Sequence, residues 1–92
     1  MAAVKRVAGR WNPLAMDNAK YTALVLEAYE DEVAGVAYFE GLALAYPEKA
    51  VFLGNCAALE RATAEQLSAL IRKYRLTPQA QAALAQRGAL EA

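Results

Sequence analysis

The chain has 92 residues, which suits one small domain, and its formal net charge of zero gives no reason to expect a polyanionic ligand. Its hydrophobic fraction of 58% is high for so short a chain, so some apolar surface is expected to be buried against a partner. The chain has no histidine, which excludes serine–histidine and cysteine–histidine nucleophile pairs. Its single cysteine excludes an internal disulfide and favours a cytoplasmic location, and no stretch is apolar enough to predict a membrane span.

The first residues carry little pattern, and 1–12 are predicted to form a flexible basic tail with too few charges to indicate a nucleic-acid site. Asn12 followed by Pro13 matches a helix N-cap with proline at the first helical position, and Asp17 or Asn18 is an alternative cap. A first helix is therefore predicted over 13–46, where the next residue, Pro47, ends it.

Two further helices are predicted after this proline. Pro47 suits the first turn of a second helix over 47–76, whose basic last turn favours a C-terminus. Thr77 and Pro78 begin a short third helix over 78–87, and Gly88 is expected to end it. Because the connection between the long helices is so short, they are predicted to form an antiparallel hairpin. The sequence thus predicts an all-α fold, with 13–92 as one helical domain.

Apolar residues recur along both long helices at alternating steps of three and four, which is the spacing of a helix-bundle seam. Glu32 interrupts the first stripe, and Glu60 and Thr63 interrupt the second. The first stripe comprises Tyr21, Val25, Ala28, Glu32, Gly35, Phe39, Leu42 and Tyr46, and the second comprises Leu53, Cys56, Glu60, Thr63, Leu67, Leu70 and Tyr74.

The two acids in these stripes are predicted to lie at one level of the hairpin. Glu32 lies 15 residues before Pro47 and Glu60 lies 13 after it. A buried carboxylate is costly unless it is paired, protonated or bound to a metal, so the coincidence predicts a site. The alternative is that one or both acids lie at the edge of the seam and reach water. Glu30 and Glu40 lie on a neighbouring stripe, and the sequence does not decide whether they are buried or exposed. Cys56 is expected to pack in the core.

Residues 30–39, with Leu42 and Ala43, resemble the first helix of rubrerythrin and other ferritin-like proteins, and residues 52–53 and 59–67 resemble the second. The resemblance covers about residues 20–75. In that family the first helix supplies a glutamate ligand and the second supplies Glu-x-x-His. The resemblance therefore implies Glu32 and Glu60 as metal ligands, with Thr63 in the position of the histidine.

The same resemblance implies iron or manganese as the cofactor and, if the chain is an enzyme, a di-iron or di-manganese oxidoreductase or ferroxidase activity. A hydroxyl is a poorer ligand than imidazole for such metals. A metal-free assembly or scaffold module is therefore one alternative, and a helical binder of an apolar ligand is another. The family's bundle has four helices, so the expected partner is another copy of the chain, in a homodimer or a higher oligomer, or the missing half of a longer chain. No nucleic acid or membrane is expected as a partner.

Overall fold

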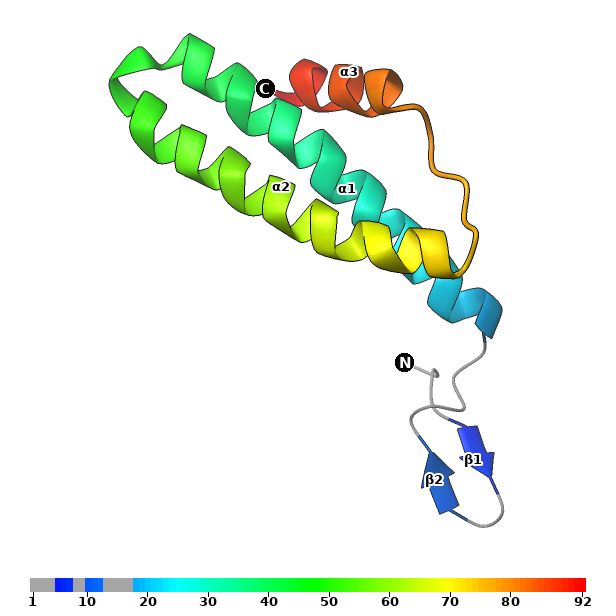
Figure 1. Ribbon diagram of the computed structural model, residues 1–92. Helices are drawn as coiled ribbons and strands as arrows, with labels where there is room; N and C mark the ends of the chain where they lie inside the picture. Colours follow the sequence, from blue (N-terminus) through cyan, green and yellow to red (C-terminus); the bar gives the residue numbers. More distant parts are fainter. Residues whose placement is uncertain (1–4, 8–9, 13–17) are drawn as a thin grey trace.

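The computed structural model describes residues 5–7, 10–12 and 18–92, and from Asn18 onward the chain is helical apart from its connections (Figure 1). The three α-helices are α1 (Asn18–Ala45), α2 (Ala50–Lys73) and α3 (Gln81–Glu91), and a short 3₁₀ helix, η2 (Pro47–Lys49), precedes α2. The predicted all-α architecture with three helices is confirmed for this part of the chain.

Two short strands lie within the segment that the sequence predicts to be a basic tail. They are β1 (Lys5–Val7) and β2 (Arg10–Asn12), and they pair antiparallel with Arg6 opposite Trp11. Three residues are too few for an alternating pattern to be recognised, which is why the sequence gives no strand signal there.

The predicted start of the first helix at Pro13 falls among residues that the structure does not describe. Asn12 closes β2 opposite Lys5, and residues 13–17 lie outside the described residues. The described helix begins at Asn18, which is one of the two alternative caps.

Helices α1 and α2 form the predicted antiparallel hairpin (Figure 1). At the turn, the Tyr46 N–H donates to the Leu42 carbonyl at 2.8 Å, and the Lys49 N–H donates to the Tyr46 carbonyl at 2.9 Å. At the open end, the rings of Tyr21 and Tyr74 meet edge to face with centroids 5.6 Å apart. Both ends of the hairpin are therefore fixed, which sets the register of everything between them.

Helix α2 ends at Lys73, three residues before the predicted end at Leu76. Arg75 has a φ of 53°, in the left-handed region. The Leu76 N–H donates to the Ile71 carbonyl at 2.9 Å, and the Arg75 N–H donates to the Arg72 carbonyl at 3.2 Å. These two bonds form a Schellman motif, which usually has glycine at the left-handed position. With arginine there, the sequence gives no stop signal.

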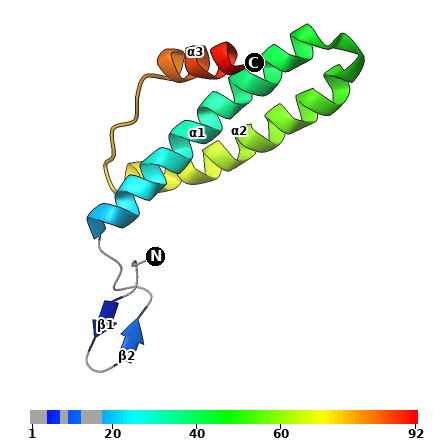
Figure 2. The same cartoon turned by 180° about the vertical axis from the view of Figure 1, so that it is seen from behind.

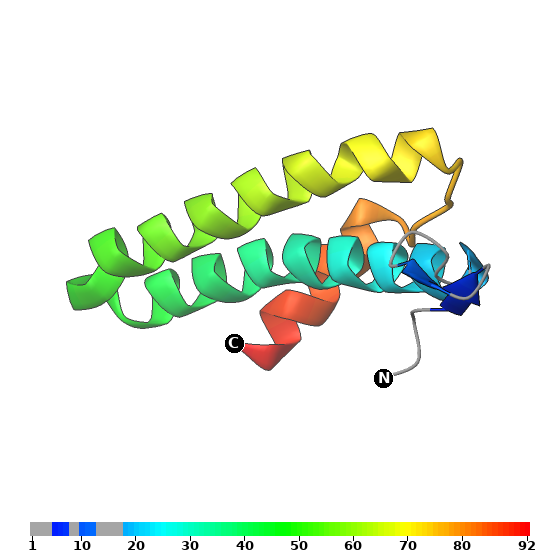
Figure 3. The same ribbon diagram turned by 90° about the horizontal axis from the view of Figure 1, so that it is seen from below.

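Helix α3 crosses α1 on the side away from α2 (Figure 3). The prediction that Gly88 ends this helix was wrong, because Gly88 lies inside α3, is buried, and the helix continues to Glu91. A Cβ at Gly88 would lie 1.9 Å from the Ala34 carbonyl oxygen of α1. Glycine is needed here for the close approach of two backbones, not for a helix stop. The chain ends beside α1 (Figure 2), where a Cβ on Gly41 would meet the Ala92 methyl.

The core is small, and the predicted stripes only partly describe it. The prediction was right for Val25 and Leu53, which are buried, but on α2 the buried residues otherwise lie one position after the predicted ones. None of the helices in the described ranges is long and apolar enough to span a membrane. The buried apolar residues of the described chain are Val25, Ala34, Leu53, Ala57, Ala64, Ile71 and Leu84.

Candidate functional site

Glu32 and Glu60 meet at the middle of the hairpin. Glu32 is 14 residues from the start of α1 and 13 from its end, and Glu60 is 10 residues from the start of α2 and 13 from its end. Both residues are half-buried, and a hydrogen bond joins their carboxyl groups. The expectation that the two acids reach the same level therefore agrees with the geometry.

Gly35, one turn after Glu32, makes room for this contact. A Cβ at Gly35 would lie 3.2 Å from the Glu60 carboxyl carbon and 3.4 Å from its Oε1. The Glu60 carboxyl group thus rests against the α1 backbone, where a larger residue would press on it. The position of Gly35 next to Glu32 on the same stripe could have indicated this role. From the sequence alone, however, a glycine at this position indicates only a small core residue.

The contact with Glu60 favours protonation of Glu32. The hydrogen bond that the protonated Glu32 carboxyl donates to Glu60, together with partial burial and the negative charges of Glu60 and Asp31, raises the pKa of Glu32 to about 7. A hydrogen bond between two carboxyl groups requires one of them to be protonated, because two carboxylates offer only acceptors. At pH 7 Glu32 is about half protonated, so repulsion between the two groups remains, and a cation placed between them would relieve it.

The other acids of α1 near Glu32 have donors as partners. Glu30 accepts the Gln79 backbone N–H at 2.8 Å, and Asp31 pairs with Arg87 at 2.8 Å. The Tyr29 hydroxyl accepts a hydrogen bond from the Gln81 side chain at 3.3 Å. Sequence reasoning missed these contacts, because partners about 50 residues away leave no local pattern. Three consecutive residues of α1 thus hold α3 and the connection before it, while Glu32 faces α2.

Thr63, which stands in the position of the family's histidine, is exposed. Its hydroxyl donates to the Leu59 carbonyl of its own helix at 3.1 Å. The neighbouring Ala64 takes the buried position instead. Cys56, one turn before Glu60, is a free, half-buried thiol. The structure therefore brings Glu32 and Glu60 together and leaves Thr63 at the edge of the pair.

The residues of one chain offer few ligands for a metal. Among the residues that the structure describes, no group of three histidine, cysteine, aspartate or glutamate side chains is placed to hold a metal ion. Glu32 and Glu60 supply four carboxyl oxygens, whereas iron, manganese and other hard cations take about six ligands. Water or residues from another chain must complete any such site.

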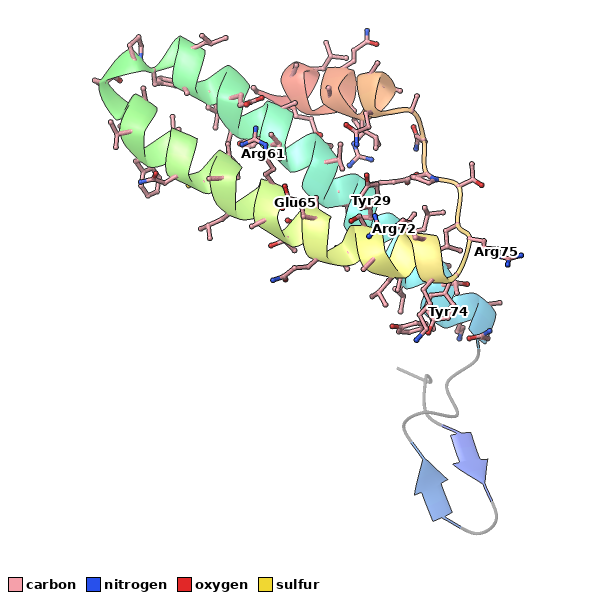
Figure 4. All side chains as sticks on the ribbon, viewed as in Figure 1. Tyr29, Arg61, Glu65, Arg72, Tyr74 and Arg75 are labelled. Atoms are coloured by element: carbon pink, nitrogen blue, oxygen red, sulfur yellow. The ribbon has the colours of Figure 1, made fainter. Side chains whose placement is uncertain are left out.

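On the side of the hairpin opposite the carboxyl pair, a cleft of about 480 Å³ lies between α1, α2 and α3. Arg61 reaches across it to Glu40 at 3.0 Å, and both side chains are more than half exposed. Tyr29 and Glu65 lie on the same side (Figure 4). The apolar-ligand alternative would use this cleft, but its charged walls do not favour a purely apolar molecule. The question left open for Glu40 is answered: it pairs with Arg61 at the surface.

Comparison with protein-family models, with curated proteins and with solved structures finds no match to this chain.

Replacing Gly35 with alanine should disturb the carboxyl pair more than the fold. The new methyl group would press on the end of the Glu60 side chain, so the hydrogen bond to Glu32 should weaken and the pKa of Glu32 should fall. The gain in helix propensity, up to about 1 kcal/mol, offsets the crowding, so the free energy of unfolding should change little. Carbon-13 NMR titration of the glutamate carboxyl groups measures the pKa.

Gly54→Ala is the matched control for this prediction. Nothing lies within 4 Å of a Cβ at Gly54, so alanine there should stabilise α2 without changing the pKa of Glu32. An unchanged pKa in Gly35→Ala would show that Glu60 does not rest on Gly35.

Proposed function

We propose that the chain is a ferritin-like half-bundle that binds iron or manganese, with Glu32 and Glu60 as its ligands. The observation that carries this proposal is the direct contact of the two carboxyl groups at the middle of both long helices. Acids at this level of two adjacent helices are what the resemblance to ferritin-like proteins leads one to expect. A cytoplasmic location belongs to the same proposal, and the single free cysteine is compatible with it.

A bound cation would take the place of the shared proton. Both states solve the same physical problem, which is the repulsion of two half-buried carboxylates at one height. A divalent ion allows both groups to ionise, and oxygen ligands suit iron(II) and manganese(II). Glu30, Asp31 and Glu40 are engaged with donors and are not expected to contribute. The proposal covers metal binding; an oxidoreductase or ferroxidase activity would need more ligands than these two.

A metal-free assembly module is the second candidate, and the position of Thr63 favours it. The hydroxyl that replaces the family's imidazole is exposed and bonded within its own helix. In this alternative the proton-sharing pair is the lasting state of the site, and the hairpin serves only to associate with other helices.

Titration with manganese(II) separates the two candidates. The electron paramagnetic resonance signal of free Mn²⁺ should decrease when the chain is added, and Glu32→Gln should abolish that decrease while the helical circular dichroism stays intact. Glu27→Gln, an exposed acid on the same helix, is the control and should bind as the wild type does. Because Mn²⁺ must displace the shared proton, its affinity should increase as the pH rises through about 7. An undiminished Mn²⁺ signal with the wild-type chain would exclude the first candidate.

A further inference from the structure

One face of the hairpin is apolar and uncovered, and it is the face onto which the carboxyl pair opens. Glu60 rests on Gly35 on one side of the α1–α2 seam, whereas Arg61 reaches Glu40 on the other side. Successive residues of an α-helix are rotated by about 100° around its axis. These two contacts therefore determine which other residues of α1 and α2 lie on each side of the seam. On the Gly35 side, named here the open face, the apolar residues are Leu24, Gly35 and Leu42 of α1 and Phe52, Leu59 and Leu70 of α2, and Cys56 and Thr63 lie among them next to Glu60.

Charge distinguishes the open face from the opposite side, whereas exposed apolar residues occur on both, such as Leu44, which lies on the cleft side and is 85% exposed. Leu24 is 57% exposed, Phe52 is 67% exposed and Leu59 is 70% exposed. Apart from the carboxyl pair itself, none of the six residues is charged, and Asp31 beside them pairs with Arg87 of α3. The cleft side instead carries Glu40, Arg61 and Glu65, as expected of a surface that faces water.

Helix α3 does not cover the open face. It packs on α1 away from α2, and its residues Arg87 and Glu91 lie beside Asp31 and Tyr38 at the border of that face. An apolar centre with a charged border is the usual composition of a protein–protein interface. A partner that covers this face therefore meets apolar side chains on both sides of the carboxyl pair and charged groups at the α3 edge.

The open face is complementary to a second copy of itself. Glu32 and Glu60 lie near the middle of α1 and α2, and apolar residues lie towards both ends. A two-fold axis through the pair would place the turn end of one copy, with Phe52 and Leu59, over the open end of the other, with Leu24 and Leu70. The two hairpins then overlap along their whole length and close a four-helix bundle. A central pair is what such a contact requires, because the carboxyl groups of both copies meet only where the two-fold axis passes.

We infer that the partner is a second copy of this chain, which packs its open face on the first and brings a second Glu32–Glu60 pair to the site. The inference rests on the proposed function in one respect, since the second copy supplies the ligands that one chain lacks. Four carboxyl groups would then surround one position, and α3 lies outside the bundle.

Light scattering of the full chain at micromolar concentration without metal tests the inference. The wild type should show twice the mass of the 9.9 kDa chain. Leu59→Lys places a charge in the open face and should halve that mass. Val51→Lys is the matched control, because Val51 is an equally apolar residue of α2 that is 82% exposed but points away from α1 and from the open face, so its dimer should persist. Circular dichroism confirms that each variant stays helical, and Phe52→Lys replaces Leu59→Lys if that variant does not fold.

A monomeric wild type would overturn the inference, and so would a dimer that Val51→Lys disrupts or that Leu59→Lys and Phe52→Lys leave intact. A monomer that still binds Mn²⁺ would overturn the dimer and keep the proposed function. A dimer through this face that binds no Mn²⁺ would do the reverse.

Discussion

Replacing Gly88 with alanine is expected to detach α3 from α1 and to lower the free energy of unfolding by about 3 kcal/mol. The added methyl group would lie 1.9 Å from the Ala34 carbonyl oxygen, 2.9 Å from the Ala34 carbonyl carbon and 3.0 Å from the Tyr38 nitrogen. These are backbone atoms in the middle of a long helix, so no side-chain rotation can relieve the overlap. The two helices must separate, and Leu84, which is fully buried, loses its packing as they do.

Two measurements check this expectation. Urea denaturation gives the change in the free energy of unfolding, and amide hydrogen exchange shows where protection is lost. Exchange should increase over 81–91 and much less over α1 and α2, because the hairpin has its own contacts. Gly54→Ala, the same substitution at a glycine with open space around it, should stabilise the protein by up to about 1 kcal/mol. Unchanged exchange in α3 of Gly88→Ala would show that the helices do not cross at this glycine.

Gly88 also shows where sequence reasoning about this fold reaches its limit. A glycine near the end of an apolar stretch usually stops a helix, and that rule predicted the end of the third helix. What decides the matter is the backbone of α1 around Ala34, more than 50 residues earlier in the chain. A local pattern carries no record of such a contact, so the sequence alone could not separate a helix stop from a helix crossing.

The hairpin could be predicted because its signals are local. Pro47 breaks one helix and begins the next, and the alternating spacing of three and four residues places Tyr21 and Tyr74 on facing stripes, where their rings meet. The register within α2 was one residue off at Cys56 and Thr63, because a stripe of this spacing has two nearly equivalent edges. The buried positions are the next residues, Ala57 and Ala64.

The contact of Glu32 with Glu60 could be predicted for a simpler reason. Both acids lie on their stripes at nearly equal distances from the turn, and an antiparallel hairpin brings such positions together whichever edge of the stripe is buried. The partners of Glu30 and Asp31 could not be predicted in this way, because they depend on how α3 returns to α1.

Replacing Glu32 with glutamine is expected to remove a dependence of stability on pH that the wild-type chain shows without metal. The pKa of Glu32 is about 7 in the folded chain, against an ordinary value of 4.5. Between these two values the folded chain holds a proton that the unfolded chain has lost, so the free energy of unfolding falls as the pH rises. The loss is nearly complete about one pH unit above the folded-state pKa, near pH 8. It should amount to about 1–2 kcal/mol, less than the full shift implies, because water reaches the half-buried pair.

Glutamine should imitate the protonated acid at every pH. Its amide donates a hydrogen bond to the Glu60 carboxylate and adds no charge. The variant and the wild type should therefore be about equally stable near pH 5, and the variant should be more stable at pH 8 by about 1–2 kcal/mol. Urea denaturation at both pH values, with a chelator present, measures the difference. Glu27→Gln should keep the wild-type slope, because Glu27 is exposed and lies outside the pair.

Added Mn²⁺ should reverse the pH dependence of the free energy of unfolding if the carboxyl pair binds the metal. A cation that binds the folded chain stabilises it by RT ln(1 + [L]/Kd), and the dissociation constant falls as the pH rises, because the shared proton must leave. With Mn²⁺ in excess, the free energy of unfolding of the wild type should therefore rise with pH instead of falling, whereas Glu32→Gln should respond to neither ion. If the wild-type slope is flat in chelator, the carboxyl groups do not share a proton. If the slope keeps its sign in Mn²⁺, the proton is the only cation that the pair holds.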